Sequence, residues 1–417
     1  MMTPYEYILN NIYTYVDIMF AQVKNLQIRR RKCNVANMFS LMIHASHTNN
    51  NDKSFKNLYT SNRNLSDGAY TYWKTKIYSL NFVDNFHSIA VDNNFYKHKL
   101  NNNFMGLFDK YNILAGDGTK VKCAYKICDN QGKNIAAINI VAIYDIRYGT
   151  FRDYKIAYDC NEHTGILQHD LTKNDLIILD RYYASHELMN ILKKKTTFLI
   201  RLKLNLLCVK KFMLDTNTTE KVVNYSGTRI KLVKYWIDKK TKNIILNKYK
   251  DIDDKNDDDM SDCYVVATND TTLSANECIF LYKKRWSIET SFKQLKQNFK
   301  IRYVNKQITT KTPLLKTEFW FRMSFLMYNM TSVLKNSIDA SQQNECKFSE
   351  CAIFICDTIT GILKISNLKD DLKTLITKTY YTTTRIKKIT RCIKPGVYKS
   401  IVTIDASNKK LIQKDNG

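Results

Sequence analysis

The chain has 417 residues, of which 44% are hydrophobic, and it carries a formal net charge of +26 at pH 7. This length allows two or three domains with a sizeable core, and the apolar content excludes a disordered protein. Such a large positive charge favours a polyanionic partner, either a nucleic acid or an anionic membrane surface. No uncharged apolar run is long enough to span a membrane, because the most apolar segment, residues 319–334, contains Arg322. We therefore expect a nucleic acid as the partner, and no membrane.

The cysteines and histidines show no pattern typical of metal binding. The eleven cysteines form no CxxC pair, and the seven histidines are dispersed along the chain. This distribution argues against a structural metal cage and favours a reduced intracellular protein. The first ten residues, MMTPYEYILN, lack the basic and apolar regions of a signal peptide, so none is expected.

Residues 1–104 form a predicted helical domain. Residues 5–27 have apolar side chains at helical spacing, and a basic run follows at residues 29–32. Such a run is typical of a solvated face, a phosphate contact or a nuclear signal. Residues 64–77 fit the second helix of a helix-turn-helix unit, although a plain helical bundle fits them equally well.

Residues 105–345 are predicted to form an α/β domain. Three strands, a helix, a strand, a helix and a strand follow one another, which is the element order of the ribonuclease-H-like fold. The expected ranges are 112–122, 134–146, 151–159, 162–170, 175–180, 184–194 and 196–204. This layout places one carboxylate on the first strand and a second just beyond the fourth, at strand ends where open α/β sheets usually bind ligands.

Residues 205–262 interrupt this order and are predicted to be a β-rich insertion. GTRIKLVKYWI and NIILNKY are expected to be hairpin strands, and the acidic run DIDDKNDDDMSD is expected to be a solvated loop rather than a metal site. Residues 264–270 return to the sheet, and residues 319–334 form a buried helix that packs on it. The basic C-terminal region, residues 346–417, is expected either to be solvated or to contact DNA or a second subunit.

The helix expected over Leu281–Gln297 carries four different chemistries on one stripe. At about 100° per residue, its polar side chains project within roughly 60° of one another, namely Tyr282, Arg285, Glu289 and Lys296, with Lys293 on the same stripe. A neighbouring apolar face consists of Leu281, Ile288, Phe292, Leu295 and Phe299. Trp286 is interpreted as a core residue rather than a base-stacking platform. An ordinary solvated amphipathic helix would show the same two faces.

The spacing Tyr-x2-Arg-x3-Glu-x6-Lys on this helix resembles the signature of DDE transposases of the insertion-sequence-four type, without a gap or substitution. Such enzymes require two further aspartates upstream. Asp117, in AGDGT, resembles the first, and Asp180, in LDRYY, resembles the second. Asp145 is the alternative for the first position, but it matches a later strand of the family. Tyr182 replaces the usual glycine after Arg181. This difference leaves the geometry of the turn undetermined, but it does not affect the assignment of the Asp180 carboxylate.

The resemblance implies metal-dependent catalysis. Asp117, Asp180 and Glu289 would together hold two Mg²⁺ or Mn²⁺ ions about 4 Å apart, since hard cations prefer oxygen ligands. By position, it also assigns DNA contacts near the cut end to Tyr282, Arg285, Lys293, Lys296 and Arg181.

The implied function is that of a DNA transposase. It would bind the inverted repeats at transposon ends through residues 1–104, cleave the DNA and join the freed 3′-hydroxyls to target DNA. A homodimer is expected in the synaptic complex, inside the cell and associated with DNA in a nucleoid or a nucleus. Two alternatives stay open: a transposase-derived DNA-binding protein that is no longer mobile, and a nuclease of the same fold that hydrolyses DNA without joining it.

Overall fold

The computed structural model of the chain describes residues 105–128, 134–157, 162–215, 217–225, 227–236, 263–299, 313–342, 347–359, 387–390, 401–405 and 410–414. One compact unit contains the described residues up to Phe325, and a second contains those from Leu326 onward. The predicted helical domain over residues 1–104, the NIILNKY strand and the acidic run lie outside the described residues. The predicted domain boundaries stay predictions.

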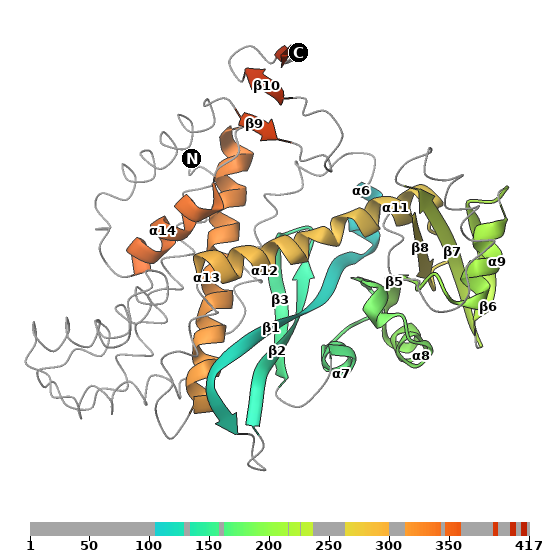
Figure 1. Cartoon of the computed structure of the whole chain (residues 1–417), viewed down its shortest axis with the longest axis horizontal. Coiled ribbons are helices and arrows are strands. Elements are labelled where there is room, and N and C mark those ends of the chain that lie inside the picture. Colours follow the sequence, from blue (N-terminus) through green and yellow to red (C-terminus); the bar gives the residue numbers. More distant parts are fainter. Residues whose placement is uncertain are drawn as a thin grey trace, which may run out of the picture. The chain divides into compact units, whose positions relative to one another are not determined.

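An eight-stranded mixed sheet forms the centre of the first unit (Figure 1). Its strands are, in spatial order, β3 (Thr150–Ala157), β2 (Asn134–Asp145), β1 (Asn112–Cys128), β4 (Asp175–Leu179), β5 (Thr197–Arg201), β8 (Cys263–Thr268), β7 (Thr228–Trp236) and β6 (Glu220–Tyr225). The adjacent strands β1, β4 and β5 are parallel, and the other neighbouring pairs are antiparallel. The chain is therefore mixed α/β, and the strands predicted from its apolar runs are confirmed with small shifts at their ends.

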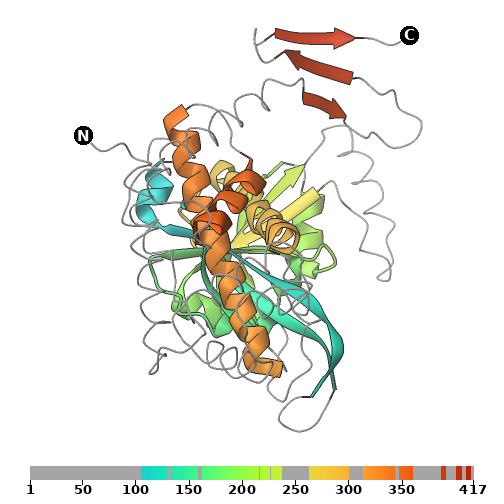
Figure 2. The ribbon, with the colours of Figure 1, turned by 90° about the vertical axis from the view of Figure 1, so that its left-hand side faces the viewer.

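Helices cover both faces of this sheet (Figures 1 and 2). On one face, α7 (Glu162–Leu167), α8 (His186–Lys195) and α9 (Leu207–Leu214) share a core with Ile177 and Leu179. On the other face, α6 (Met105–Lys110) and α11 (Ala275–Lys284) share a core with Leu176 and Ile178. All five residues of β4 are buried, as expected for a central parallel strand that is covered on both sides.

The region predicted to be a β-rich insertion differs from expectation at its start, because it begins with the helix α9. Val209, Phe212 and Met213 are buried and lie three and four residues apart, which is the spacing of one helical face. The strands that follow, β6 and β7, form a hairpin that pairs with β8 and so extends the main sheet.

The helix predicted over Leu281–Gln297 is divided at Arg285 into α11 and α12 (Trp286–Asn298). The Arg285 N–H donates to the Tyr282 carbonyl at 3.1 Å, and the Ile288 N–H donates to the Arg285 carbonyl at 3.1 Å. These bonds span three residues instead of four and tighten the helix locally. Arg285 nevertheless keeps right-handed helical angles (φ −53°, ψ −35°), and the two helices run nearly end to end across the sheet in Figure 1.

The helix predicted over residues 319–334 is confirmed as part of α13 (Pro313–Gln342). Phe325 stacks on Tyr154 with ring centroids 4.1 Å apart and meets Phe151 at 4.7 Å, so this part of α13 packs against β3. The second unit contains α14 (Phe348–Ile359) and a three-stranded antiparallel sheet of β9 (Lys387–Thr390), β10 (Ile401–Asp405) and β11 (Lys410–Lys414). None of the described helices is both long and apolar enough to cross a bilayer.

Candidate active site

Asp117 lies on β1, and Asp180 directly follows the last residue of the adjacent parallel strand β4. The β1–β4 ladder pairs Ala115 with Ile178, and each aspartate follows two residues after one of these partners. Asp180 keeps an extended backbone (φ −81°, ψ 179°), so both carboxylates point to the same face as Ile178, which α11 covers. The negative charge of Asp180 acts on the Asp117 carboxyl, which is consistent with this shared face.

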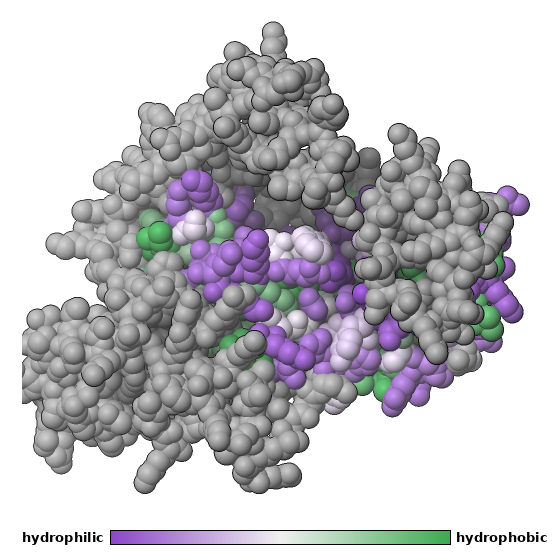
Figure 3. All heavy atoms as spheres, viewed as in Figure 1, coloured by the Kyte–Doolittle hydropathy of each residue, from purple (hydrophilic) through white to green (hydrophobic). Residues whose placement is uncertain are grey.

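Glu289 reaches this site from α12. The predicted apolar side of this helix is confirmed, because Ile288, Phe292 and Leu295 are buried and fix α12 on the sheet. Hydrophilic side chains gather along α12 on the face seen in Figure 3. Arg285, one helical turn before Glu289, forms an ion pair with its carboxylate.

The charges of these residues act on one another. Burial raises the pKa of Asp117 to about 7, opposed by the hydrogen bond from the Gly118 N–H and by the positive charge of Arg285. The negative charges of Asp180 and Glu289 add to the increase. The three carboxylates predicted from the sequence and the guanidinium of Arg285 therefore form one electrostatic site.

The turn after Asp180 accommodates the tyrosine that stands at the usual glycine position. The Asp180 Oδ1 accepts a hydrogen bond of 2.7 Å from the Tyr182 N–H and caps a short 3₁₀ turn, Arg181–Tyr183. Such a turn uses right-handed angles that any L-residue adopts, so glycine is not required. Arg181 is half-buried in this turn and Tyr182 is exposed.

Further basic side chains lie on α12 beyond Glu289 and at the end of β5. Lys293 is exposed and Lys296 is half-buried on α12, one and two turns beyond Glu289. Burial raises the pKa of the Tyr282 phenol, whereas the positive charges of Arg285 and Arg201 oppose that increase. Arg201, the last residue of β5, was not predicted. The available signal was its place at the carboxyl end of a parallel strand.

A sequence profile described as "Transposase DDE domain" matches residues 109–330, more than half of the chain. The chain belongs to the transposase DDE domain family. Its function is that of a DNA transposase. The matched range includes all three predicted carboxylates and the whole of the main sheet. No curated protein sequence matches this transposase.

Among solved structures, the transposase is similar to the piggyBac transposase in its synaptic complex with hairpin DNA. The two chains are 11% identical, and the alignment covers 99% of this chain and 95% of that one with a TM-score of 0.43. A similarity at that level gives no residue correspondence.

Glycines flank Asp117 because α7 approaches β1 closely at this point. A Cβ atom on Gly116 would lie 2.7 Å from Leu179 Cδ2 and 2.9 Å from Ile166 Cδ1, and one on Gly118 would lie 2.4 Å from Glu162 Cδ. The AGDGT segment of the transposase therefore presents one carboxylate toward α12 and no side chain toward α7.

Asp145, the alternative first carboxylate, lies away from the other two. It pairs with Leu114, three residues before Asp117, which is roughly 10 Å along the strand. Its Oδ1 accepts hydrogen bonds from the Arg147 N–H at 2.9 Å and the Tyr148 N–H at 3.2 Å. These bonds stabilise the turn that follows β2.

The interpretation of Trp286 as a core residue is wrong, because 64% of its surface is exposed. The reason is its position on α12. Trp286 lies two residues before the buried Ile288, which is about 200° around the helix and therefore on the opposite side. Its indole lies next in sequence to Arg285 and is free to meet a ligand.

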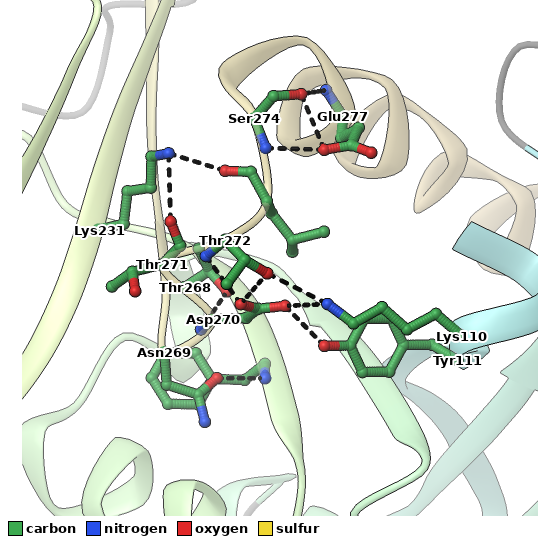
Figure 4. Close-up of polar contacts among 12 residues, drawn as sticks. Lys110, Tyr111, Lys231, Thr268, Asn269, Asp270, Thr271, Thr272, Ser274 and Glu277 are labelled. Atoms are coloured by element: carbon green, nitrogen blue, oxygen red, sulfur yellow. Dashed lines mark hydrogen bonds and ion pairs between the residues drawn. The ribbon is translucent and has the colours of Figure 1, made fainter. Parts of the chain in front are cut away.

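A polar network joins the segment before α11 to the junction between α6 and β1 (Figure 4). Asp270, between β8 and α11, accepts hydrogen bonds from the Tyr111 hydroxyl at 2.6 Å, the Lys110 ammonium at 3.1 Å and the Thr272 hydroxyl at 2.7 Å. Ser274 then caps α11 through a reciprocal pair of bonds with Glu277. This network holds the start of α11 in place, and Arg285 and Glu289 follow along α11 and α12.

DDE transposases use divalent metal ions, and the side chains at this site suit them chemically. Three carboxylates offer the hard oxygen ligands that Mg²⁺ prefers. As they stand, no three Asp, Glu, His or Cys side chains in the described part of the transposase converge on one point, and Glu289 is held by Arg285. The donors therefore fit divalent ions, and Glu289 would exchange Arg285 for an ion.

Proposed function

We propose that this transposase cleaves DNA at transposon ends and joins the freed 3′-hydroxyls to target DNA, with Asp117, Asp180 and Glu289 as its catalytic carboxylates. The observation that supports this most strongly is that Asp117 on β1 and Asp180 at the end of the parallel strand β4 point to the same face of the sheet. The strand order β3-β2-β1-β4-β5 with these directions supports a ribonuclease-H-like core, to which β8, β7 and β6 are added.

The three carboxylates would hold two divalent ions, Mg²⁺ or Mn²⁺. When bound, these ions activate the attacking hydroxyl and stabilise the leaving oxygen. The raised pKa of Asp117 supports this role, because a buried carboxylate among others is stabilised in its charged form by a nearby cation. Glu289 contributes its oxygens once Arg285 has moved to a phosphate.

The remaining residues of the Tyr-Arg-Glu-Lys set would hold the DNA. Arg285 forms forked, charge-assisted hydrogen bonds with a phosphate near the cut, where negative charge develops in the transition state. Tyr282 lies beside it, with its ring 5.8 Å from the guanidinium carbon. Further phosphate contacts come from Lys293, Lys296 and Arg181.

The other parts of the chain would supply recognition and assembly. Residues 1–104 bind the inverted repeats, residues 105–345 catalyse with the insertion at 205–262, and the basic residues 346–417 contact DNA or a second subunit. A homodimer pairs the two ends in the synaptic complex, and the protein acts inside the cell on nucleoid or nuclear DNA.

An assay of strand joining tests this proposal. The full-length protein is incubated with Mg²⁺, a supercoiled target plasmid and labelled duplexes from the DNA that flanks its reading frame on both sides. We expect labelled ends joined covalently to the plasmid, and loss of these products in Asp180→Asn. Cleavage without joined products would instead identify a nuclease, and binding without cleavage would identify a DNA-binding protein that is no longer mobile.

A further inference from the structure

A fourth carboxylate, that of Glu162, lies against the strand that carries Asp117. Glu162 is the first residue of α7, and its side chain contacts β1 at Gly118. A Cβ atom at Gly118 would lie 2.4 Å from Glu162 Cδ and 2.8 Å from its Oε2. The carboxylate thus occupies the space that any other residue at position 118 would fill.

Because β4 ends at Leu179, it does not extend between the Glu162 carboxylate and the carboxylates of Asp117, Asp180 and Glu289. The β1–β4 ladder stops at Ala115 and Ile178, so the edge of β1 has no β4 partner at Asp117 and Gly118. Asp117 points to the α11 side of the sheet and position 118 points to the α7 side. Asp117 and Glu162 therefore border, from opposite sides of the sheet, the gap where β4 ends before Asp180.

An unpartnered hydroxyl marks the same place. Tyr183 is fully buried, and its hydroxyl has no hydrogen-bond partner among the described residues. Its ring stacks on His163, next to Glu162, with centroids 5.5 Å apart. Burial raises the pKa of this phenol, and the negative charges of Asp117, Glu162 and Asp180 raise it further. A buried hydroxyl beside three carboxylates suits a site that takes up a hydrated cation.

The electrostatics of Glu162 agree with this position. Burial raises the pKa of Glu162, Lys120 opposes the increase, and the negative charge of Asp180 adds to it. Glu162 and Asp180 thus repel each other across the gap, as expected for two ligands of a cation that is needed to neutralise them.

We propose that Glu162 is a fourth carboxylate ligand of the divalent ions at this site, binding from the α7 side of the sheet while Asp117, Asp180 and Glu289 bind from the α12 side. This inference rests on the proposed function of those three residues. Two divalent ions carry four positive charges, so a fourth carboxylate brings the ligand set close to neutrality.

Binding of Mn²⁺ to the full-length protein without DNA tests the proposal, measured by calorimetry and by the paramagnetic resonance of free Mn²⁺. We expect Glu162→Gln to lower Mn²⁺ affinity tenfold or more, or to remove one of two bound ions. Its Tm in EDTA should equal or exceed that of the wild type, because a repulsion between carboxylates is lost. The matched control is Glu187→Gln, which alters an exposed glutamate in the first turn of α8 and should bind Mn²⁺ like the wild type.

Asp117→Asn separates failure of this inference from failure of the proposed function. If Asp117→Asn loses Mn²⁺ binding while Glu162→Gln retains it, the role of Glu162 is overturned and the proposed function stands. If Asp117→Asn binds Mn²⁺ like the wild type, the proposed function is overturned together with this inference.

A double-mutant cycle with Gly118 gives a second test should Glu162→Gln fold poorly. Gly118→Ala introduces a methyl group that displaces the Glu162 side chain, so it should also lower Mn²⁺ affinity. In a Glu162→Ala background the methyl group meets no carboxylate, and Gly118→Ala should change the affinity less than twofold. Additive losses from the two substitutions would overturn the proposal.

Discussion

At the scale of single residues, Arg285 interacts with several side chains of the site. It is paired with Glu289 one turn along the helix, and its charge also acts on Asp117 and Tyr282. The positive charge of Arg285 offsets part of the negative charge of the site while Glu289 is paired with it. A DNA phosphate and a metal ion would then separate the ion pair, because the phosphate would bind Arg285 and the ion would bind Glu289.

Substitution of Arg285 tests this exchange. Arg285→Ala removes a charged contact worth about 1.5–3 kcal/mol, so binding of a pre-cut end duplex should weaken by roughly ten- to a hundredfold. Arg285→Lys should recover only part of the loss, because an ammonium group cannot form a forked contact. Binding is measured by fluorescence anisotropy. Equal affinities for all three proteins would show that Arg285 makes no DNA contact.

The elements of the site differ in how clearly the sequence predicted them. Strand β4 was predicted because DLIIL is apolar throughout, and Asp117 and Asp180 were predicted from short motifs on two strands. The helix α9 was missed although Val209, Phe212 and Met213 have helical spacing. Glu162 was not predicted because its contact with Gly118 joins segments that are distant in sequence, which no local pattern records. Arg201 was not predicted although it ends a strand that the sequence does predict. A large apolar residue such as Trp286 favours burial, but its position two residues before the buried Ile288 places it on the exposed side of α12.

The two sides of α12 predict opposite effects of removing an aromatic ring. Trp286 is exposed, so Trp286→Ala should change the free energy of unfolding by less than about 0.5 kcal/mol. If its indole stacks on an unpaired base at the cut end, DNA binding should weaken by about 1–3 kcal/mol.

Phe292→Ala provides the contrast on the buried side of the same helix. Phe292 is 4% exposed and contacts Phe151, so its loss should cost about 3–5 kcal/mol of stability. Chemical unfolding and anisotropy titrations measure both effects. A large loss of stability in Trp286→Ala would contradict the assignment of the two sides.

The Asp270 network makes the stability of the segment before α11 depend on pH. Burial would raise the pKa of Asp270, but hydrogen bonds from Tyr111, Thr272 and Lys110 outweigh it and lower the pKa to about 2. A depressed pKa means that the charged form stabilises the fold above the unfolded-state pKa of about 4, and that this contribution is lost as pH falls from about 4 to 2.

Asp270→Asn should therefore lower the free energy of unfolding at pH 7 by roughly 1–2 kcal/mol, a figure reduced for partial exposure. The difference from the wild type should shrink as pH falls from 4 toward 2, as followed by urea unfolding at each pH. Asp170→Asn, at an exposed aspartate outside the network, serves as the control. A difference that stays constant over this range would contradict the assigned hydrogen bonds.

At the scale of the whole molecule, the net charge of +26 exceeds what a few site residues need. A charge of this size attracts DNA through phosphate contacts that release counterions. We expect the affinity of the full-length protein for random duplex DNA to fall at least a hundredfold between about 50 and 200 mM salt. A fall of less than threefold would show that the charge does not serve DNA binding.

The central claim is that Asp117, Asp180 and Glu289 form one metal-dependent DNA-cleaving site. Its most direct test compares the wild type and Glu289→Gln on uncut duplexes that carry the DNA flanking the reading frame. Glutamine keeps the size of the side chain and removes the charge that would bind an ion. We expect the wild type to cleave with Mg²⁺ or Mn²⁺ and only to bind with Ca²⁺, while Glu289→Gln binds the duplex in every case and does not cleave it. Cleavage by Glu289→Gln at the wild-type rate, or undiminished wild-type cleavage in excess EDTA, would contradict the claim.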